Sequence, residues 1–209
     1  NFTKTTSDSG DFLNWGLIRH KSKTNNYGGS SSTSEDYTYT LDGSNVDIVI
    51  QDSGVEFAHS EFKGTDGVER TVTIDWYSLS GVTGTQNANH NRDLDGHGTH
   101  CAGIAAGLNY GVAKNANVYF VKVSGLEGST DGATGIATTD CFDVIKGWHN
   151  NKIDNPLTGV PNPTVVNMSW GYLTTYTNTS LTAINYRGTS YTGTDINTTS
   201  KREDDFGLN

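Results

Sequence analysis

Four short apolar runs interrupt an otherwise polar chain and predict the strands of a sheet. They are residues 46–51, 71–76, 117–123 and 164–168. Each is rich in β-branched or aromatic residues, and turn-forming residues bound most of them, as is typical of buried strands.

Between these runs the apolar spacing changes to that of helices. Residues 97–106 are mostly small and contain no strong breaker before Gly107, which predicts a helix that packs closely against its neighbours. A second helix is predicted by one apolar stripe at helical spacing, formed by Cys141, Val144, Ile145 and Trp148. Thr139 is its expected N-cap. Strands that alternate with helices predict an α/β fold with a mostly parallel central sheet flanked by helices.

Both ends of the chain are polar. Residues 1–40 form an N-terminal polar arm, in which 24–34 reads as a surface loop. Beyond Thr174 the pattern degrades: residues 181–186 predict a short helix, and 187–209 predict no strand. We therefore expect one partial domain over 1–209, in which 174–209 is a polar insertion or a truncated end.

The charge and the cysteine content of the chain argue against several classes of protein. The 209 residues include 14 basic and 23 acidic side chains, for a net charge of −9. Without a clustered basic face, nucleic acid and anionic membranes are poor partners. No apolar run approaches the roughly 18 residues of a membrane helix. Cys101 and Cys141 do not make a disulfide framework, and both are expected to be small core residues.

Asp52 and His97 are the candidate catalytic residues. Asp52 ends the first strand and is followed by Ser53 and Gly54, and the carboxyl ends of strands are where α/β sheets build their sites. His97 lies between Gly96 and Gly98 at the start of a helix. An Asp–His pair is the base half of a nucleophilic triad. Each residue alone equally fits a structural role, as a turn cap or a loop histidine.

A metal site is the alternative for this stretch. Asp95, His97 and His100 lie close in sequence. A third ligand at a recognised spacing and the glutamate of the zinc-hydrolase helix motif are both missing. We expect no metal here.

Three motifs follow one another along the chain: Asp52–Gly54, His97–Gly103 and Asn167–Gly171. Their order resembles that of the subtilisin-like serine proteases, the subtilases. The chain resembles the proteinase K branch most, through Trp15–Leu17 and residues 110–123. The resemblance covers residues 15–172 and implies a three-layer subtilisin-like fold whose C-terminal part is missing.

The resemblance assigns roles to single residues. Asp52 would be the triad aspartate and His97 the general base, with Cys101 matching a family cysteine beside it and His100 a packing residue. An extended polypeptide substrate would pair with two backbone segments. These segments are Gly128, Ser129 and Thr130 on one side and Ser169, Trp170 and Gly171 on the other. Thr130 and Tyr172 stand where the family commonly has glycine, which puts the pocket shape in question.

The family's nucleophile motif, Gly-Thr-Ser-Met-Ala-x-Pro, and its oxyanion-hole Ala-Gly-Asn are both absent from the 209 residues. Gly188-Thr189-Ser190 lacks the Ala-x-Pro continuation and follows Ser169 too soon. The chain is therefore interpreted as the N-terminal portion of a serine endopeptidase that carries Asp and His but not Ser, inactive by itself. The alternative is a catalytically inactive peptide-binding pseudoprotease module.

The resemblance implies no cofactor for the chemistry. Glu61 stands where some members have a calcium-binding carboxylate, but the loop that completes that site is missing between Leu108 and Val112. No calcium site is therefore assigned. An N-terminal propeptide upstream and secretion are expected by analogy with the family.

Overall fold

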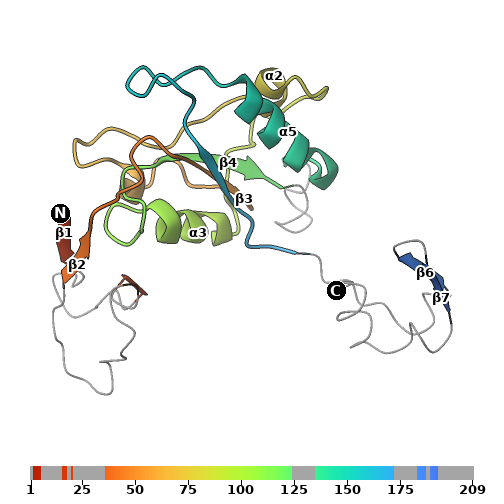
Figure 1. Cartoon of the computed structure of the whole chain (residues 1–209), viewed down its shortest axis with the longest axis horizontal. Helices are drawn as coiled ribbons and strands as arrows, with labels where there is room; N and C mark the ends of the chain where they lie inside the picture. The colour runs from red at the N-terminus through yellow and green to blue at the C-terminus, as the bar shows by residue number, and fades with distance from the viewer. Residues whose placement is uncertain are drawn as a thin grey trace. The chain divides into compact units, whose positions relative to one another are not determined.

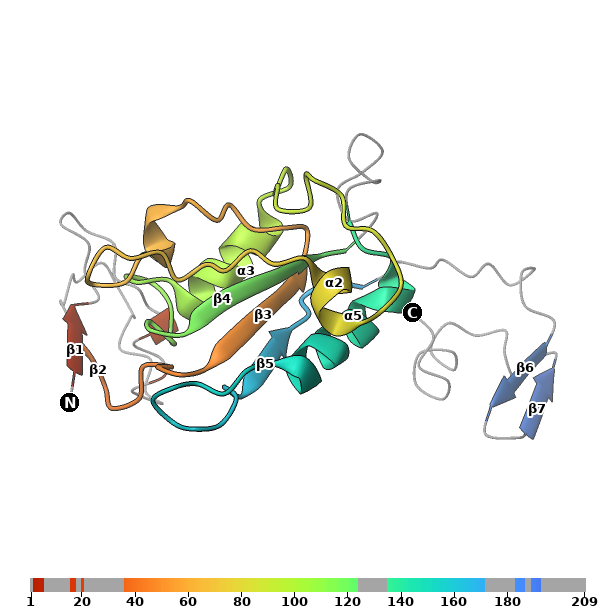
Figure 2. The same ribbon diagram turned by 90° about the horizontal axis from the view of Figure 1, so that it is seen from above.

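A three-stranded parallel sheet, with β3 (Asp47–Asp52) in the middle, organises most of the chain. β4 (Asn117–Lys122) and β5 (Thr164–Asn167) flank it (Figure 2). Asp47 lies opposite both Asn117 and Thr164, so the three strands begin level. Their carboxyl ends therefore meet at one edge of the sheet, and Asp52 lies there.

The computed structural model describes residues 2–5, 16–17, 20, 36–123, 135–171, 183–186 and 189–192. The chain divides into two units, Asn1–Ser169 and Trp170–Asn209, and each is described by itself. Within the described part, no helix has the length and apolar character needed to cross a membrane.

Helices cover both faces of the sheet, as expected from the sequence. α3 (His97–Ala106) lies on one face, and α5 (Thr138–Asn151) lies on the other with α2 (Trp76–Ser80) beside it (Figure 1). The predicted α/β class with a parallel sheet between helices is thereby confirmed. A short 3-10 turn, η1 (Ser60–Phe62), closes the α3 side.

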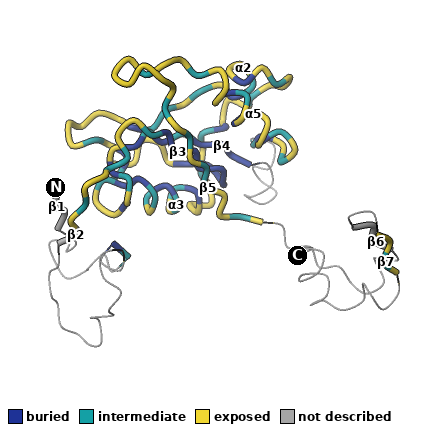
Figure 3. Tube along the Cα trace, viewed as in Figure 1, coloured by how far each residue is buried: buried dark blue, intermediate teal, exposed yellow. Residues whose placement is uncertain are grey.

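The two sides of the sheet are packed differently, and the sequence explains why. On the α3 side, Ile48 and Ile50 pack beneath Ala102 and Ala106, whose small side chains let the helix approach closely. On the α5 side, Trp148 contacts Trp76 with ring centroids 5.2 Å apart and Tyr119 with centroids 4.6 Å apart. Among the strands whose burial is described, β3 and β4 between these layers are the most buried (Figure 3), whereas β5 is partly exposed.

The second predicted strand is wrong. Thr71 makes only an isolated bridge to Val118, and Trp76 begins α2. The side chain of Asp75 accepts a hydrogen bond from the Ser78 amide at 3.0 Å and so caps this helix. An aspartate inside the apolar run was the signal for a helix start.

The predicted apolar stripe of α5 is confirmed, because Cys141, Val144, Ile145 and Trp148 are all buried. Its predicted cap is wrong. The helix begins at Thr138 after Ala137, which makes no side-chain cap. Thr139 lies within the first turn, where its hydroxyl donates to Asp140 at 3.0 Å.

The terminal segments contain strands that the sequence analysis did not predict. β1 (Phe2–Thr5) pairs antiparallel with β2 (Asp36–Tyr39), inside the expected polar arm. β6 (Ala183–Tyr186) pairs antiparallel with β7 (Thr189–Thr192), which contradicts both the short helix and the absence of strands there. β-branched and aromatic residues on either side of Arg187-Gly188 favour a hairpin over a helix. The expected surface loop 24–34 lies outside the described residues.

One buried polar side chain conflicts with its surroundings. Gln51, near the end of β3, is 0% exposed, and neither polar atom of its amide has a hydrogen-bond partner among the described residues. A buried amide without partners lowers stability. Gln51→Leu, which keeps a similar volume, is therefore expected to raise the free energy of unfolding by about 1–2 kcal/mol.

Urea denaturation would measure this change, and Gln86 offers a matched control. Gln86 accepts from the Trp76 amide at 2.9 Å and donates to the Ile74 carbonyl at 2.8 Å. Gln86→Leu is accordingly expected to lower stability. A destabilised Gln51→Leu would mean that the Gln51 amide is satisfied after all.

Candidate active site

The structure brings Asp52 and His97 together at the carboxyl edge of the sheet. Asp52 is the last residue of β3 and His97 the first of α3. His97 Nδ1 lies 2.8 Å from Asp52 Oδ1. The Asp52 side chain is only 1% exposed and that of His97 is 46% exposed. A buried carboxylate thus holds a ring that faces solvent.

The hydrogen bonding at this pair determines which ring nitrogen can act as a base. Asp52 Oδ1 also accepts from the Ser53 amide at 2.7 Å. The hydrogen bond to Asp52 and the charge of that carboxylate raise the pKa of His97 above its ordinary value, with smaller contributions from Asp95 and Asp93. Because Nδ1–H donates to Asp52, Nε2 is the nitrogen left to accept a proton. This is the arrangement of a general base with its orienting carboxylate.

Backbone contact between the two segments makes this geometry possible. A Cβ on Gly98 would lie 2.0 Å from the Gly54 carbonyl oxygen. Gly54 itself has a φ of +123°, a conformation that favours glycine, and a Cβ there would lie 2.5 Å from the Arg92 carbonyl oxygen. Glycine at position 98 lets the start of α3 touch the segment after β3, and glycine at position 54 lets that segment touch the loop before α3.

Cys101 lies one helical turn beyond His97. Its Sγ is 3.9 Å from His97 Nδ1, and its side chain is partly buried. Burial raises the pKa of the Cys101 thiol, and a hydrogen bond with Ser169 opposes the rise. A raised pKa lowers the fraction of thiolate, the nucleophilic form of cysteine, at neutral pH.

Comparison with protein families decides what this geometry belongs to. The model of the subtilase family matches residues 43–202, which is well over half of the chain. The matched range contains both Asp52 and His97.

The chain belongs to the subtilase family.

Similar proteins include fungal members of this family. A subtilisin-like serine protease of Cochliobolus lunatus is 36% identical over 136 residues, which cover 64% of this chain and 22% of that protein. One of Penicillium rubens is 34% identical over 159 residues, covering 75% of this chain and 32% of that protein. A solved cold adapted subtilisin-like serine proteinase is 34% identical, with a TM-score of 0.42 and coverage of 66% and 41%. This subtilase chain spans about a fifth to a third of the length of the curated relatives it matches.

The predicted substrate-binding residues are only partly described. Gly128, Ser129 and Thr130 lie outside the described residues. Ser169 follows β5, is exposed, and donates to Asn167 Oδ1 at 3.2 Å. Its side chain also has a hydrogen bond with Cys101. Trp170 and Gly171 begin the second unit of the subtilase chain.

His100 does not have the packing role expected of it, because it is exposed. Among the described residues, potential metal-ligand atoms of Asp52, His97 and Cys101 lie within 4.8 Å of one another. This group is the acid–base pair with its neighbouring thiol, and it does not include Asp95 or His100. The metal alternative built on His100 therefore gains no support.

Glu61 is surrounded by donors rather than by the oxygen ligands that calcium prefers. Its Oε2 accepts from the Asn109 amide at 2.8 Å and from the Tyr110 amide at 3.2 Å, and its Oε1 accepts from Asn109 Nδ2 at 2.5 Å. The backbone carbonyls of residues 108, 109 and 111 accept hydrogen bonds from the ammonium group of Lys114, at 3.2, 3.1 and 2.7 Å. The residues present here do not fit a calcium site.

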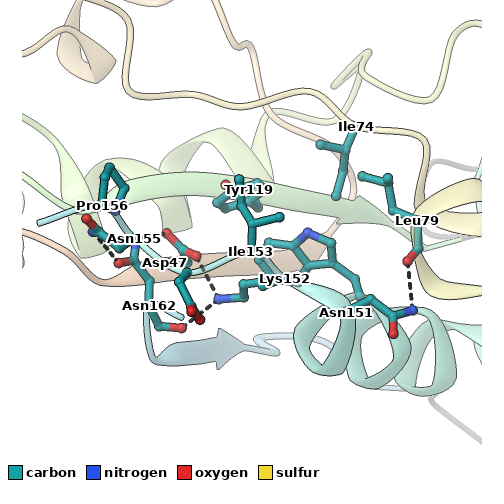
Figure 4. A pocket seen from close by; sticks show the side chains of 12 residues that line it. Asp47, Ile74, Leu79, Tyr119, Asn151, Lys152, Ile153, Asn155, Pro156 and Asn162 are labelled. Carbon is teal, nitrogen blue, oxygen red and sulfur yellow. Dashed lines mark hydrogen bonds and ion pairs between the residues drawn. The ribbon is translucent and has the colours of Figure 1, made fainter. Parts of the chain in front are cut away.

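A cavity of about 500 Å³ lies away from this site. Asp47, at the opposite end of β3 from Asp52, lines it and pairs with Lys152 at 2.7 Å (Figure 4). Burial and the charge of Asp47 raise the pKa of Tyr119 in its wall to about 12. Lys152 Nζ also lies 4.4 Å from the centre of the Trp148 ring. The polar groups at its base thus satisfy one another, and the cavity is not part of the candidate active site.

Asp93 is a residue of the site that the sequence analysis did not identify. It lies in the loop before α3, and its Oδ1 accepts from the Gly96 amide at 2.8 Å. An aspartate three residues before a glycine at a helix start was the available signal, since short acidic side chains commonly bond nearby backbone amides.

Proposed function

We propose that this chain supplies the general base and its orienting carboxylate to a subtilisin-like serine endopeptidase that uses an Asp-His-Ser triad. The observation that carries the proposal is the 2.8 Å contact between buried Asp52 and half-exposed His97. Membership of the subtilase family supplies the reaction class, which is hydrolysis of peptide bonds.

Each side chain then has a defined task. His97 Nε2 takes the proton of the serine hydroxyl as it attacks the scissile carbonyl, and returns that proton to the leaving amine. Asp52 keeps the ring in the tautomer with the proton on Nδ1 and stabilises the imidazolium that forms. The raised pKa of His97 agrees with this role, since the Asp52 carboxylate favours the protonated ring.

The serine is not assigned within residues 1–209. Ser190, the only serine in a partial match to the family motif, lies in strand β7 opposite Asn185 and not at a helix start. We therefore propose that residues 1–209 alone lack peptidase activity.

The proposed substrate is a polypeptide in extended conformation. It would pair with the backbone of Gly128–Thr130 and of Ser169–Gly171, adding a strand between them. The exposure of Ser169 and its proximity to Cys101 support the second segment. No cofactor is required for this chemistry. Secretion and an upstream propeptide are proposed by analogy with the family.

Labelling with a fluorophosphonate probe, which reacts with activated serines, tests the function. The native protein that contains these residues is expected to label, and the isolated chain 1–209 is expected not to label. A folded native protein that binds peptides yet never labels would overturn the proposal in favour of a peptide-binding pseudoprotease. Labelling of the isolated chain would show that a serine within 1–209 is the nucleophile.

A further inference from the structure

Asp52 and His97 are carried by two segments that are far apart in sequence. Asp52 belongs to the segment after β3, residues 52–56, and His97 to the start of α3, residues 96–99. The hydrogen bond between the two side chains is one link between the segments, and the backbone contact of Gly98 with Gly54 is another. Further hydrogen bonds join the two segments.

The Asp93 carboxylate contacts both segments. Its Oδ1 accepts from Ser53 Oγ at 2.9 Å and from the Gly96 amide at 2.8 Å. Its Oδ2 accepts from the Thr99 amide at 2.8 Å and from the Thr99 hydroxyl. One carboxylate thus receives four hydrogen bonds, one from the segment of Asp52 and three from the segment of His97.

The hydroxyls that donate to Asp93 extend the connection. Ser53 Oγ accepts from the Gly98 amide at 2.9 Å, and Thr99 Oγ1 accepts from the Glu56 amide at 2.9 Å. Each hydroxyl therefore donates to Asp93 and accepts a backbone amide of the opposite segment. Removal of the carboxylate would leave both hydroxyls without the acceptor that orients them.

This network needs the ionised carboxylate. Although burial raises the pKa of Asp93, hydrogen bonds from Thr99, Gly96 and Ser53 together hold it below its ordinary value. An ionised carboxylate offers acceptors to all four donors. An asparagine would turn an NH₂ group toward two of them, so Asp93→Asn disrupts the network while keeping the shape of the side chain.

We propose that Asp93 is a positioning residue whose carboxylate locks the start of α3 against the end of β3, so that His97 meets Asp52. The proposal rests on the proposed function for its relevance to catalysis. Its physical content is the geometry of the Asp52–His97 hydrogen bond, which can be measured without a nucleophile.

The experiment is an NMR titration of His97 in the chain 1–209, comparing the unaltered chain with Asp93→Asn and Asp95→Asn. The Nδ1–H proton, which resonates downfield in a strong hydrogen bond to a carboxylate, is followed in the same samples. Asp95→Asn is the control, because Asp95 also raises the pKa of His97 by its charge but is exposed. Asp95→Asn is expected to change the acid dissociation constant of the His97 imidazolium about twofold and to keep the downfield Nδ1–H resonance.

Asp93→Asn is expected to increase the acid dissociation constant of His97 by about tenfold and to abolish the downfield Nδ1–H resonance, because His97 loses its contact with Asp52. If Asp93 only stabilised the fold, Asp93→Asn would lower the melting temperature. The acid dissociation constant and the Nδ1–H resonance of His97 would then be the same as in Asp95→Asn. That outcome in a folded Asp93→Asn chain would overturn the proposal.

Should Asp93→Asn fail to fold, Ser53→Ala decides the question. It removes one donor to Asp93 and the acceptor of the Gly98 amide, and leaves the carboxylate in place. The proposal requires a weakened downfield resonance, and an unchanged one would overturn it. Failure of the fluorophosphonate test would not affect these readouts, so the two proposals fail separately.

Discussion

Replacing Gly98 with alanine is expected to destabilise the chain by more than about 4 kcal/mol, because the new methyl group has no space. It would lie 2.0 Å from the Gly54 carbonyl oxygen and 3.2 Å from Asp52 Cβ. The first of these atoms belongs to the backbone, so relief requires the separation of β3 from α3. Urea denaturation monitored by circular dichroism would measure the loss.

Gly103 provides the control within the same helix. A Cβ at Gly103 would meet nothing within 4 Å. Because glycine in a helix interior has more conformational freedom to lose than alanine, Gly103→Ala is expected to raise stability by about 0.5–1 kcal/mol. If Gly98→Ala lowers the free energy of unfolding and Gly103→Ala raises it, the destabilisation comes from the contact of residue 98 with Gly54. A Gly98→Ala chain as stable as the unaltered chain would show that the two segments do not touch.

Replacing His97 with alanine is expected to lower kcat/KM by at least about 10⁴-fold in the native protein that contains these residues. The substitution removes the base that Asp52 orients. Asp52→Asn is expected to cost about as much, because an amide favours the wrong tautomer of the ring. Hydrolysis of a chromogenic peptide would measure both.

His100 is the matched control for that measurement. It lies three residues further along α3 and is exposed, with no part in the contact to Asp52. His100→Ala is expected to retain activity within a fewfold of the unaltered protein. Activity that survives His97→Ala to within tenfold would exclude a triad with His97 as base.

The sequence was enough to predict that Asp52 and His97 lie together and to predict the class of fold. β3 and α3 follow directly from an apolar run that ends in Asp52 and from a small-residue helix that begins at His97. Both signals are local, since each depends on neighbouring residues. β6 and β7 were missed because each is only four residues long, although their β-branched and aromatic residues favour strands.

The positioning of the pair was beyond what the sequence could predict. Asp93 acts through Ser53, which lies 40 residues away, and Thr99, which lies six residues away. The same composition would suit an ordinary surface loop. Likewise, nothing in the sequence of β3 indicates that Gln51 is buried without hydrogen-bond partners, because that depends on which distant segments pack around it.

The strands that pair with β3 come from distant parts of the sequence, and this affects when the Asp52–His97 site can form during folding. Asp47 pairs with Asn117, 70 residues later, and with Thr164, later still. Such separations slow folding, because the entropy of closing long loops is lost before the contacts form. α3 can form early from local contacts, but its histidine has no carboxylate until the strands assemble. A chain in which β3 and α3 have not yet packed together therefore lacks the Asp52–His97 contact.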